Sequence, residues 1–273
     1  MTEQTLAGLI RRLIIDESMR AHVGHIGSAL SIADILAALY GGVLRSASSH
    51  DPERDRLVLS KGHAALALYA ALAASSRLDR ALLSTYCGEG SQLGAHPEHV
   101  LPGVDFSTGS LGQGLSIGAG SALAARMQGS DRQVYVLMSD AECNEGSVWE
   151  AAMFAAHHRL GNLVAIIDVN GQQAFGYTRD VLEPTPLAER WAAFGWNVSE
   201  VDGHDVEGLQ QSLVAADARD PRPRLLAART TFGKGVSFME NEIAWHYWPL
   251  DALQYERACA ELAAADRALV PAR

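Results

Sequence analysis

The fold is decided by one continuous stretch, VYVLMSDAECNEGSVWEAAMFAAHHRLGNLVAIIDVN, which occupies residues 134–170. Residues 134–138 are apolar and predict a buried strand, and residues 163–168 predict a second one. Residues 146–159, which lie between them, predict a helix. A strand, a helix and a strand in this order indicate two parallel strands joined by a crossover helix.

The same alternation continues on both sides of this stretch. Further helices are predicted at residues 5–20, 28–44, 186–194 and 206–217 and directly after Gly62, and further strands at residues 197–201 and 224–230. We therefore predict an α/β fold, a doubly wound parallel sheet with helices on both faces. We expect residues 1–264 to form one domain and residues 265–273 to form a loose C-terminal tail.

Composition and charge exclude several classes of protein. The 273 residues are 48% hydrophobic and 20% charged, which argues against a disordered chain. A formal net charge of −10 argues against general nucleic-acid binding. Cys87, Cys143 and Cys259 form no CxxC pair, so we expect neither a disulfide scaffold nor a zinc site, and we expect a cytoplasmic location. The longest apolar run, residues 64–74, is shorter than the roughly 20 residues that span a bilayer.

Polar side chains follow the two strands of the opening stretch. Asp140 comes directly after the first strand, and Asn170 comes directly after the second. Because ligands bind at the carboxyl ends of parallel strands, this pairing favours a site for a hard cation such as Mg²⁺. The alternative is that Asp140 caps a helix and Asn170 belongs to a turn.

Two other features each have two interpretations, and a dinucleotide site is excluded for a third. Glu142 and Glu145 begin a helix, where the helix dipole alone explains acidic residues, although the same helix start can bind a phosphate. His63 begins another helix, where it either contacts a phosphate or is a capping or solvated side chain. The glycine cluster between residues 109 and 120 does not fit a dinucleotide site, because its spacing is wrong and no clear strand precedes it.

Several motifs together resemble transketolase. They are GHIG at residues 24–27, LSKGH at 59–63, AHPE at 95–98, STGSLGQG at 107–114 and DAECNEG at 140–146. The last motif, followed by Asn170, is similar to the thiamine diphosphate motif, in which GDG precedes an Asn at a fixed interval. The resemblance covers residues 8–248 and is closest to the separate N-terminal subunit of split transketolases.

The resemblance implies a fold, a cofactor and a metal. It implies the thiamine diphosphate-binding fold, in the form that holds the diphosphate of the cofactor. Asp140, Asn170 and the backbone carbonyl of Gln172 would ligate Mg²⁺, which holds this diphosphate. Gly109 and Leu111 would border the two rings of the cofactor.

The resemblance also assigns roles to four histidines. His63 and His246 would contact the diphosphate, with support from the N–H group of Ala141. His25 and His96 would face the reacting carbonyl and hydroxyl groups of the sugar. Histidines in these positions can move protons and stabilise a developing oxyanion.

A partner chain follows from the same resemblance. Glu145 would belong to a proton network that reaches across a dimer interface. The pyrimidine-binding domain of a complete transketolase, with its activating glutamate, has no counterpart in the motifs of this sequence. We therefore expect a separate C-terminal subunit to supply it, in a heterotetramer with two sites.

The sequence departs from the family pattern at a few positions. Ser139 and Ala141 replace the two glycines that flank the aspartate of GDG. Phe175 stands where an aspartate is expected, and Tyr247 and Trp248 stand where Gly and Lys are usual. These changes keep the expected metal ligands but alter the residues near the expected sugar site.

Three functional hypotheses result. The first is a subunit that transfers a two-carbon ketol unit from a ketose donor to an aldose acceptor. The second keeps the cofactor but passes the two-carbon unit to an unusual sugar or to a carrier thiol. The third is a subunit that only scaffolds a partner, and the presence of Asp140, Asn170, His63 and His246 argues against it, because scaffolding requires none of them.

Overall fold

A computed structural model of the chain describes residues 3–45, 51–214 and 220–269. Within these residues, five strands form one sheet in the order β1-β2-β3-β7-β6, and every neighbouring pair is parallel. The strands are β1 (Arg56–Leu59), β2 (Val134–Ser139), β3 (Leu163–Val169), β6 (Asn197–Asp202) and β7 (Arg224–Arg229). The four predicted strands are therefore present, and the predicted α/β class with a parallel sheet is confirmed.

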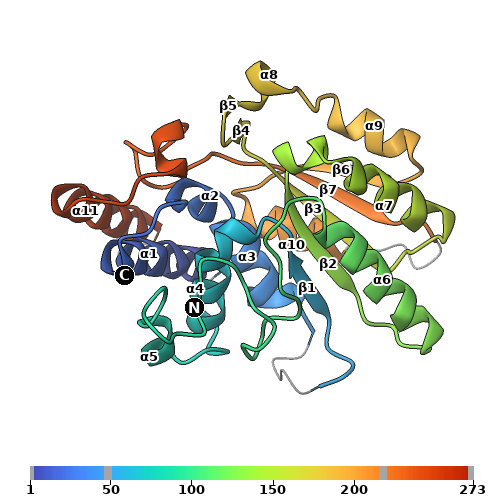
Figure 1. Cartoon of the computed structure of the whole chain (residues 1–273), viewed down its shortest axis with the longest axis horizontal. Helices are drawn as coiled ribbons and strands as arrows, with labels where there is room; N and C mark the ends of the chain where they lie inside the picture. The colour runs from blue at the N-terminus through green and yellow to red at the C-terminus, as the bar shows by residue number, and fades with distance from the viewer. Residues whose placement is uncertain (1–2, 46–50, 215–219, 270–273) are drawn as a thin grey trace.

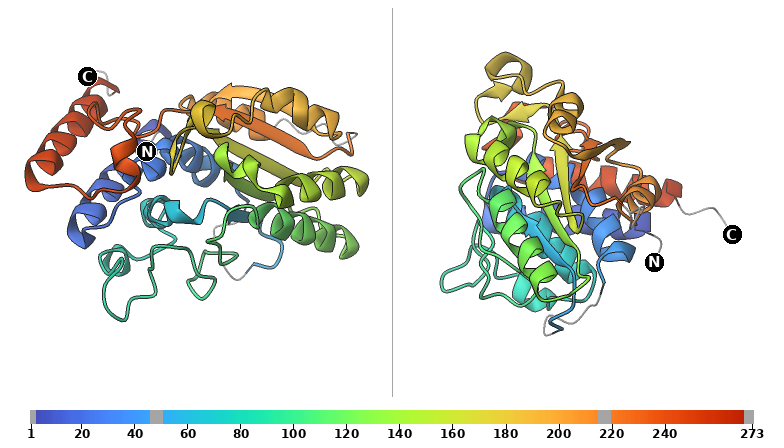
Figure 2. Two further views of the ribbon diagram at one scale, coloured as in Figure 1. Left: turned by 45° about the horizontal axis from the view of Figure 1, so that its top comes forward. Right: turned by 90° about the vertical axis from the view of Figure 1, so that its right-hand side faces the viewer.

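Helices cover both faces of the sheet (Figures 1 and 2). One layer contains α6 (Gly114–Met127), α7 (Gly146–His157) and α9 (Leu187–Ala193). The other contains α1 (Glu3–Ala21), α3 (Ala33–Ala38), α4 (Ala65–Ala74) and α10 (Val206–Val214), with α11 (Ala252–Leu269) packed on α1. Helix α10 corresponds to the first part of the helix predicted at 206–217. Residues 215–217 of that prediction lie outside the described residues.

Alternate side chains of the central strands enter two separate cores. Val134, Val136 and Met138 of β2 pack under α6 and α7, whereas Tyr135 and Leu137 point to the opposite layer. This alternation follows from the two-residue repeat of a strand. Because both faces are covered, β2 is buried along its whole length, which explains its continuous apolar sequence.

Two elements differ from the prediction. The single helix expected at 28–44 is α2 (Ile26–Ser31) and α3, followed by a π-helical turn at η1 (Leu39–Val43). The two helices separate at Ile32, which has non-helical backbone angles. The loose tail expected from residue 265 is helical as far as Leu269 in α11, and residues 270–273 lie outside the described part.

The described residues also form several short elements. They are η2 (Gly62–Ala64), η3 (Ala141–Asn144), η4 (Ile243–His246), the hairpin of β4 (Gln172–Gln173) and β5 (Gly176–Tyr177), and the helices α5 (Arg80–Leu83) and α8 (Thr178–Val181). No helix in the described ranges has both the length and the apolar run that crossing a membrane requires.

Candidate functional site

A cavity of about 280 Å³ lies beyond the carboxyl ends of β2 and β3. It brings together nine of the residues that the sequence analysis singled out. They are His25, His63, His96, Gly109, Leu111, Ala141, Asn170, Gln172 and His246. These residues come from seven separate segments of the chain, which meet because parallel strands end at one edge of the sheet.

Three of the histidines form a cluster of neutral rings. The ring centroids of His25 and His63 are 5.4 Å apart, those of His25 and His246 are 5.4 Å apart, and those of His63 and His246 are 5.8 Å apart. Burial lowers the pKa of His25, holds the pKa of His63 well below its ordinary value and lowers the pKa of His246 to about 4. The cluster is therefore uncharged at neutral pH.

Two ring nitrogens of this cluster have no protein partner. They are Nδ1 of His25 and Nδ1 of His246, and both atoms are buried. A buried polar atom without a hydrogen bond costs free energy. A polar ligand in the cavity would satisfy both atoms, so this observation indicates that the residues present fit a polar cofactor.

His63 is connected through Ser28 to a buried ion pair. Its Nε2 lies 2.8 Å from Oγ of Ser28, and Nζ of Lys61 donates to the backbone carbonyl of Ser28 at 3.2 Å. Lys61 itself is fully buried and pairs with Asp168 at the end of β3. The positive charge of Lys61 is thus neutralised within the protein.

Asp168 also orients the amide of Asn170. Its Oδ2 accepts a hydrogen bond from Nδ2 of Asn170 at 2.7 Å and one from Ser31 at 2.8 Å, and its Oδ1 accepts one from Thr230. The amide orientation of Asn170 is fixed by this contact, because only the nitrogen can donate. Its Oδ1 accepts from the N–H of Gln172 at 2.9 Å and retains a second lone pair for a ligand.

Asp140 and Asn170 lie at the ends of neighbouring strands, as predicted from their positions. Ser139 of β2 is paired with Asp168 of β3, which places the following residues side by side. The Asp140 carboxylate accepts from the N–H groups of Ala141 and Gly171, each at 2.8 Å. Burial, and next the charge of Asp168, raises the pKa of Asp140 to about 7.

A raised pKa means that the negative charge of Asp140 is poorly compensated by the protein. A divalent cation beside it would offset this cost. The side chain of Gln172 lines the 280 Å³ cavity and is buried, with neither polar atom hydrogen-bonded. The donor set of carboxylate and amide oxygens is one that Mg²⁺ prefers, so the residues fit this metal. Among the described residues, no three His, Cys, Asp or Glu side chains form a metal cluster.

Three predicted site residues are placed differently from the others. Asp140 lines an adjoining cavity of about 490 Å³, and Asn170 lines both cavities. The N–H of Ala141, expected to face a diphosphate, donates to Asp140 in this structure. Glu145 is exposed at the start of α7 and does not line the cavity.

The sequence analysis missed four residues that support the cavity. Lys61 stands inside a quoted motif and Asp168 inside a predicted strand, yet nothing in the sequence showed that they pair. Phe232 stacks on His246 with ring centroids 5.8 Å apart and an interplanar angle of 13°. Glu142, interpreted as the acidic start of a helix, is fully buried.

Three exposed aromatic side chains, which we call the aromatic rim, lie within two positions in the chain of residues that line the cavity. They are Phe175, Tyr247 and Trp248, with exposed fractions of 86%, 52% and 67%. The hydroxyl of Tyr247 donates to the carbonyl of Ala174, a residue that lines the cavity. The rim therefore joins the β4–β5 hairpin to the segment that follows His246.

Comparison with known proteins gives one consistent family. Residues 2–266 match the model described as "Transketolase, thiamine diphosphate binding domain". The chain is 42% identical to a subunit of the apulose-4-phosphate transketolase of Phocaeicola vulgatus, over 92% of this chain and 90% of that protein. It is 41% identical to the 6-deoxy-6-sulfo-D-fructose transketolase subunit SqwG of a Clostridium species, over 96% of this chain and 98% of that protein.

Solved structures agree with this result. Transketolase from Leishmania mexicana superposes with a TM-score of 0.88 at 31% identity, over 96% of this chain and 41% of that one. Transketolase from Campylobacter jejuni gives a TM-score of 0.88 at 32% identity, over 96% and 42%. The chain thus spans about two fifths of the length of these solved enzymes.

Proposed function

The chain belongs to the transketolase family and corresponds to its thiamine diphosphate-binding domain, and on this premise we propose that it is the N-terminal subunit of a two-chain transketolase. Together with a C-terminal subunit, it transfers a two-carbon ketol unit from a ketose donor to an aldose acceptor. Two relatives that are named as subunits support this proposal, because the similarity covers 90% and 98% of their own lengths.

One observation carries the proposal most directly. A single cavity at the carboxyl edge of the sheet contains nine predicted residues, including three neutral histidines with two unpartnered ring nitrogens. A scaffold protein would gain nothing from leaving buried nitrogens unpaired, because each one destabilises the fold. The arrangement supports a site for a polar cofactor.

Each group of residues has a proposed role toward the cofactor. Asp140, Asn170 and the carbonyl of Gln172 hold Mg²⁺, and His63 and His246 bind the diphosphate. The bound cofactor supplies the nucleophilic carbon and the electron sink of the reaction. The cavity supports these roles because its polar groups converge from fixed strand ends.

A second set of residues has a proposed role toward the substrate. His25 and His96 face the sugar, and an imidazole ring can accept or donate a proton at a ring nitrogen. Gly109 and Leu111 border the cofactor rings. Since His25 is neutral, it can accept a proton at its unpartnered Nδ1 without first losing one.

The partner and the assembly are also proposals. We infer a C-terminal subunit that carries the pyrimidine-binding domain, and a heterotetramer with two sites. The exposed position of Glu145 at the start of α7 supports a role at an interface between chains rather than inside this cavity. The cytoplasmic location remains a prediction from the cysteine content.

A second candidate function concerns the acceptor. The relatives are named for unusual sugars, apulose 4-phosphate and 6-deoxy-6-sulfo-D-fructose. The aromatic rim replaces charged and small residues at the edge of the cavity, which favours a substrate other than the common sugar phosphates. Transfer to a carrier thiol is an alternative with the same cofactor chemistry.

The test is calorimetric titration of the folded chain with thiamine diphosphate, with and without Mg²⁺. We expect Mg²⁺-dependent binding that Asp140→Ala abolishes, because the only carboxylate of the proposed metal site is lost. Asp202→Ala is the control, since Asp202 ends β6 at the same edge of the sheet but lies outside the cavity. Undiminished affinity in a folded Asp140→Ala variant would falsify the metal assignment.

Activity provides the second half of the test. We expect no ketol transfer by the chain alone, because the activating glutamate belongs to the proposed partner. Transfer should begin when the C-terminal chain is added. Robust turnover by the pure chain would contradict the two-chain proposal.

A further inference from the structure

Glu142 is a buried carboxylate that touches neither cavity. Its side chain is fully buried, and it is absent from the lining of both cavities at the carboxyl edge of the sheet. A carboxylate in such a place is retained only if the protein supplies hydrogen-bond donors for it.

The donors come from the loop after β1, from the loop before α6 and from the end of β2. The hydroxyl of Ser60 and the N–H of Gly112 both donate to Oε1, the latter at 2.7 Å. The N–H of Ser139 approaches Oε2 at 3.4 Å. Ser60 extends the network further, because its Oγ accepts the N–H of Gly114 at 3.1 Å.

Each of these loops carries residues of the proposed cofactor site. His63 follows the loop of Ser60, Leu111 directly precedes Gly112, and Ala141 directly precedes Glu142. Loops that meet at a cavity have no regular ladder of hydrogen bonds to hold them in register. The Glu142 carboxylate, with its three donors, joins the Ser60 and Gly112 loops to the end of β2.

All three donors are directed at the two carboxyl oxygens of Glu142. A carboxylate has only acceptor oxygens, so it accepts from a hydroxyl and two backbone N–H groups without conflict. A glutamine of the same shape would present an NH₂ group to at least one of these donors. Gly112 allows little adjustment, because it has φ of 85° and an added Cβ would lie 2.6 Å from Oγ of Ser147.

We propose that Glu142 is a positioning residue that holds the His63, Leu111 and Ala141 loops in the geometry that binds the cofactor. It acts through these loops and does not contact the cofactor. The inference rests on the proposed function, since it presupposes that the cavity binds thiamine diphosphate with Mg²⁺.

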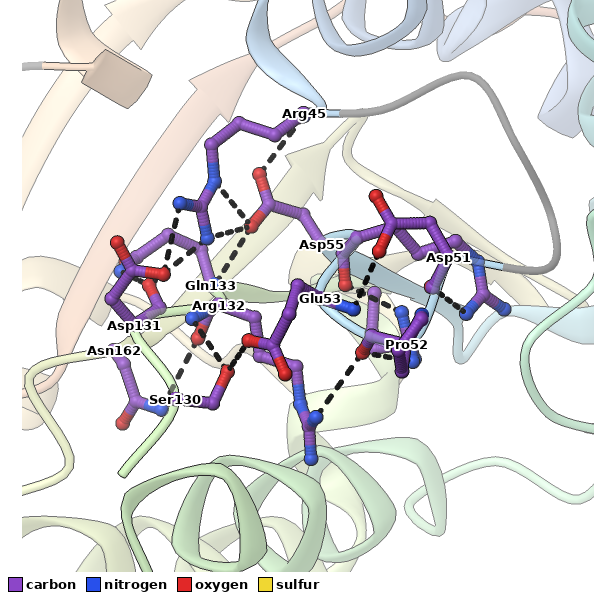
Figure 3. A network of polar contacts seen from close by, with 12 residues as sticks. Arg45, Asp51, Pro52, Glu53, Asp55, Ser130, Asp131, Arg132, Gln133 and Asn162 are labelled. Atoms are coloured by element: carbon purple, nitrogen blue, oxygen red, sulfur yellow. Dashed lines mark hydrogen bonds and ion pairs between the residues drawn. The ribbon is translucent and has the colours of Figure 1, made fainter. Parts of the chain in front are cut away.

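The structure offers a matched control at the other end of the sheet. Asp55 is also a buried carboxylate, and it accepts hydrogen bonds from Arg45 and from the N–H of Gln133 at 2.8 Å (Figure 3). It precedes β1 and lies beside the residue that precedes β2, so it is at the amino edge of the sheet. Loss of Asp55 should therefore reduce stability without disturbing the cavity.

The experiment compares Glu142→Gln with Asp55→Asn in the full-length chain. The dissociation constant of thiamine diphosphate is measured by calorimetry at saturating Mg²⁺, and thermal unfolding is measured for each variant. We expect Glu142→Gln to raise the dissociation constant by about ten-fold to 100-fold, the usual range for losing a residue that orients a ligand-binding group. We expect Asp55→Asn to lower the unfolding temperature and to keep the wild-type dissociation constant.

The outcomes separate this inference from the proposed function. A wild-type chain that binds no cofactor overturns both. Wild-type binding with an unchanged dissociation constant in Glu142→Gln overturns the inference alone, and so does an equal loss of affinity in Asp55→Asn. If Glu142→Gln does not fold, Ser60→Ala replaces it under the same criterion, because it removes one donor to the same carboxylate.

Discussion

His246 is a base whose surroundings oppose its protonation. Its ring lies against those of His25 and Phe232 and is 8% exposed. Burial lowers its pKa to about 4 from an ordinary value of 6.5, and the charges of His25 and Lys61 act in the same direction. Between these two pH values the unfolded chain binds more protons at this residue than the folded chain does.

This difference predicts how stability depends on pH. The stabilisation from a neutral His246 is complete above pH 6.5 and is lost as the pH falls toward about 4. Replacing the residue in His246→Asn should make the free energy of unfolding less dependent on pH in this window. Urea unfolding at several pH values in metal-free buffer measures the effect. The same pH dependence in both proteins would show that the histidine is not buried in its neutral form.

The sequence predicted which histidines belong to the site, but it did not predict that their rings are neutral. His25, His63 and His246 were found through motifs, because the motif letters are visible in the sequence. Their neutral form follows from burial, which depends on segments more than 180 positions apart that meet at one cavity. For the same reason Glu142 was interpreted as the acidic start of a helix, since its donors Ser60 and Gly112 lie elsewhere in the chain.

At the scale of elements, helix α6 shows how closely a helix can approach the sheet. A Cβ built at Gly118 would overlap the Cγ2 methyl of Val136, which is buried on β2. Two positions further along the same helix, a Cβ at Gly120 would meet no atom within 4 Å. The two glycines are thus in the same helix, but only Gly118 packs closely against the sheet.

This contrast makes a paired prediction. Gly118→Ala should lower the free energy of unfolding by about 1–3 kcal/mol, because the helix must move away from the sheet. Gly120→Ala should raise it by about 0.5–1 kcal/mol, because alanine restricts the unfolded chain and favours a helix. Urea unfolding of the two variants is the measurement. A stabilising effect of Gly118→Ala would mean that α6 packs further from β2.

Some of the helices and strands were predicted from the sequence, and others were missed. The strands at 134–138 and 163–168 were clear, because burial on both faces leaves an uninterrupted apolar sequence. The break at Ile32 was not visible, since α2 and α3 are buried on all sides and largely apolar. The β4–β5 hairpin was missed because each of its strands has two residues, too few for a periodic pattern.

At the scale of the whole molecule, the aromatic rim has two interpretations. Aromatic residues are enriched at protein interfaces, so the rim is suited to a partner chain. Tyr247 is also hydrogen-bonded to Ala174, a residue that lines the cavity. On the second interpretation, which we propose, the rim selects the substrate.

We expect the rim to disfavour common sugar phosphates. The complex of both chains should turn over ordinary pentose and hexose phosphates poorly, and the triple variant Phe175→Asp, Tyr247→Gly, Trp248→Lys should raise kcat/KM for them by about ten-fold. Steady-state kinetics on the reconstituted complex is the measurement. Leu253→Lys, on exposed α11, controls for the effect of adding a charge to the protein surface.

A different result would assign the aromatic rim to the interface between the two chains. If the native complex already uses ordinary sugar phosphates well, and the triple variant only weakens the binding of the two chains to each other, the rim belongs to the interface. The unusual-acceptor function would then lose its support from this chain.

The charge around the cavity has one more consequence. Among the described residues that line it, none is a lysine or an arginine, and nearby Lys61 is already neutralised by Asp168. An anionic diphosphate entering alone would find no compensating cation, and a cation entering alone would keep most of its hydration. The two ligands should therefore show strong heterotropic cooperativity, and by thermodynamic reciprocity each raises the affinity for the other by the same factor. An acidic protein can in this way bind a highly charged anion while remaining nearly indifferent to free phosphates.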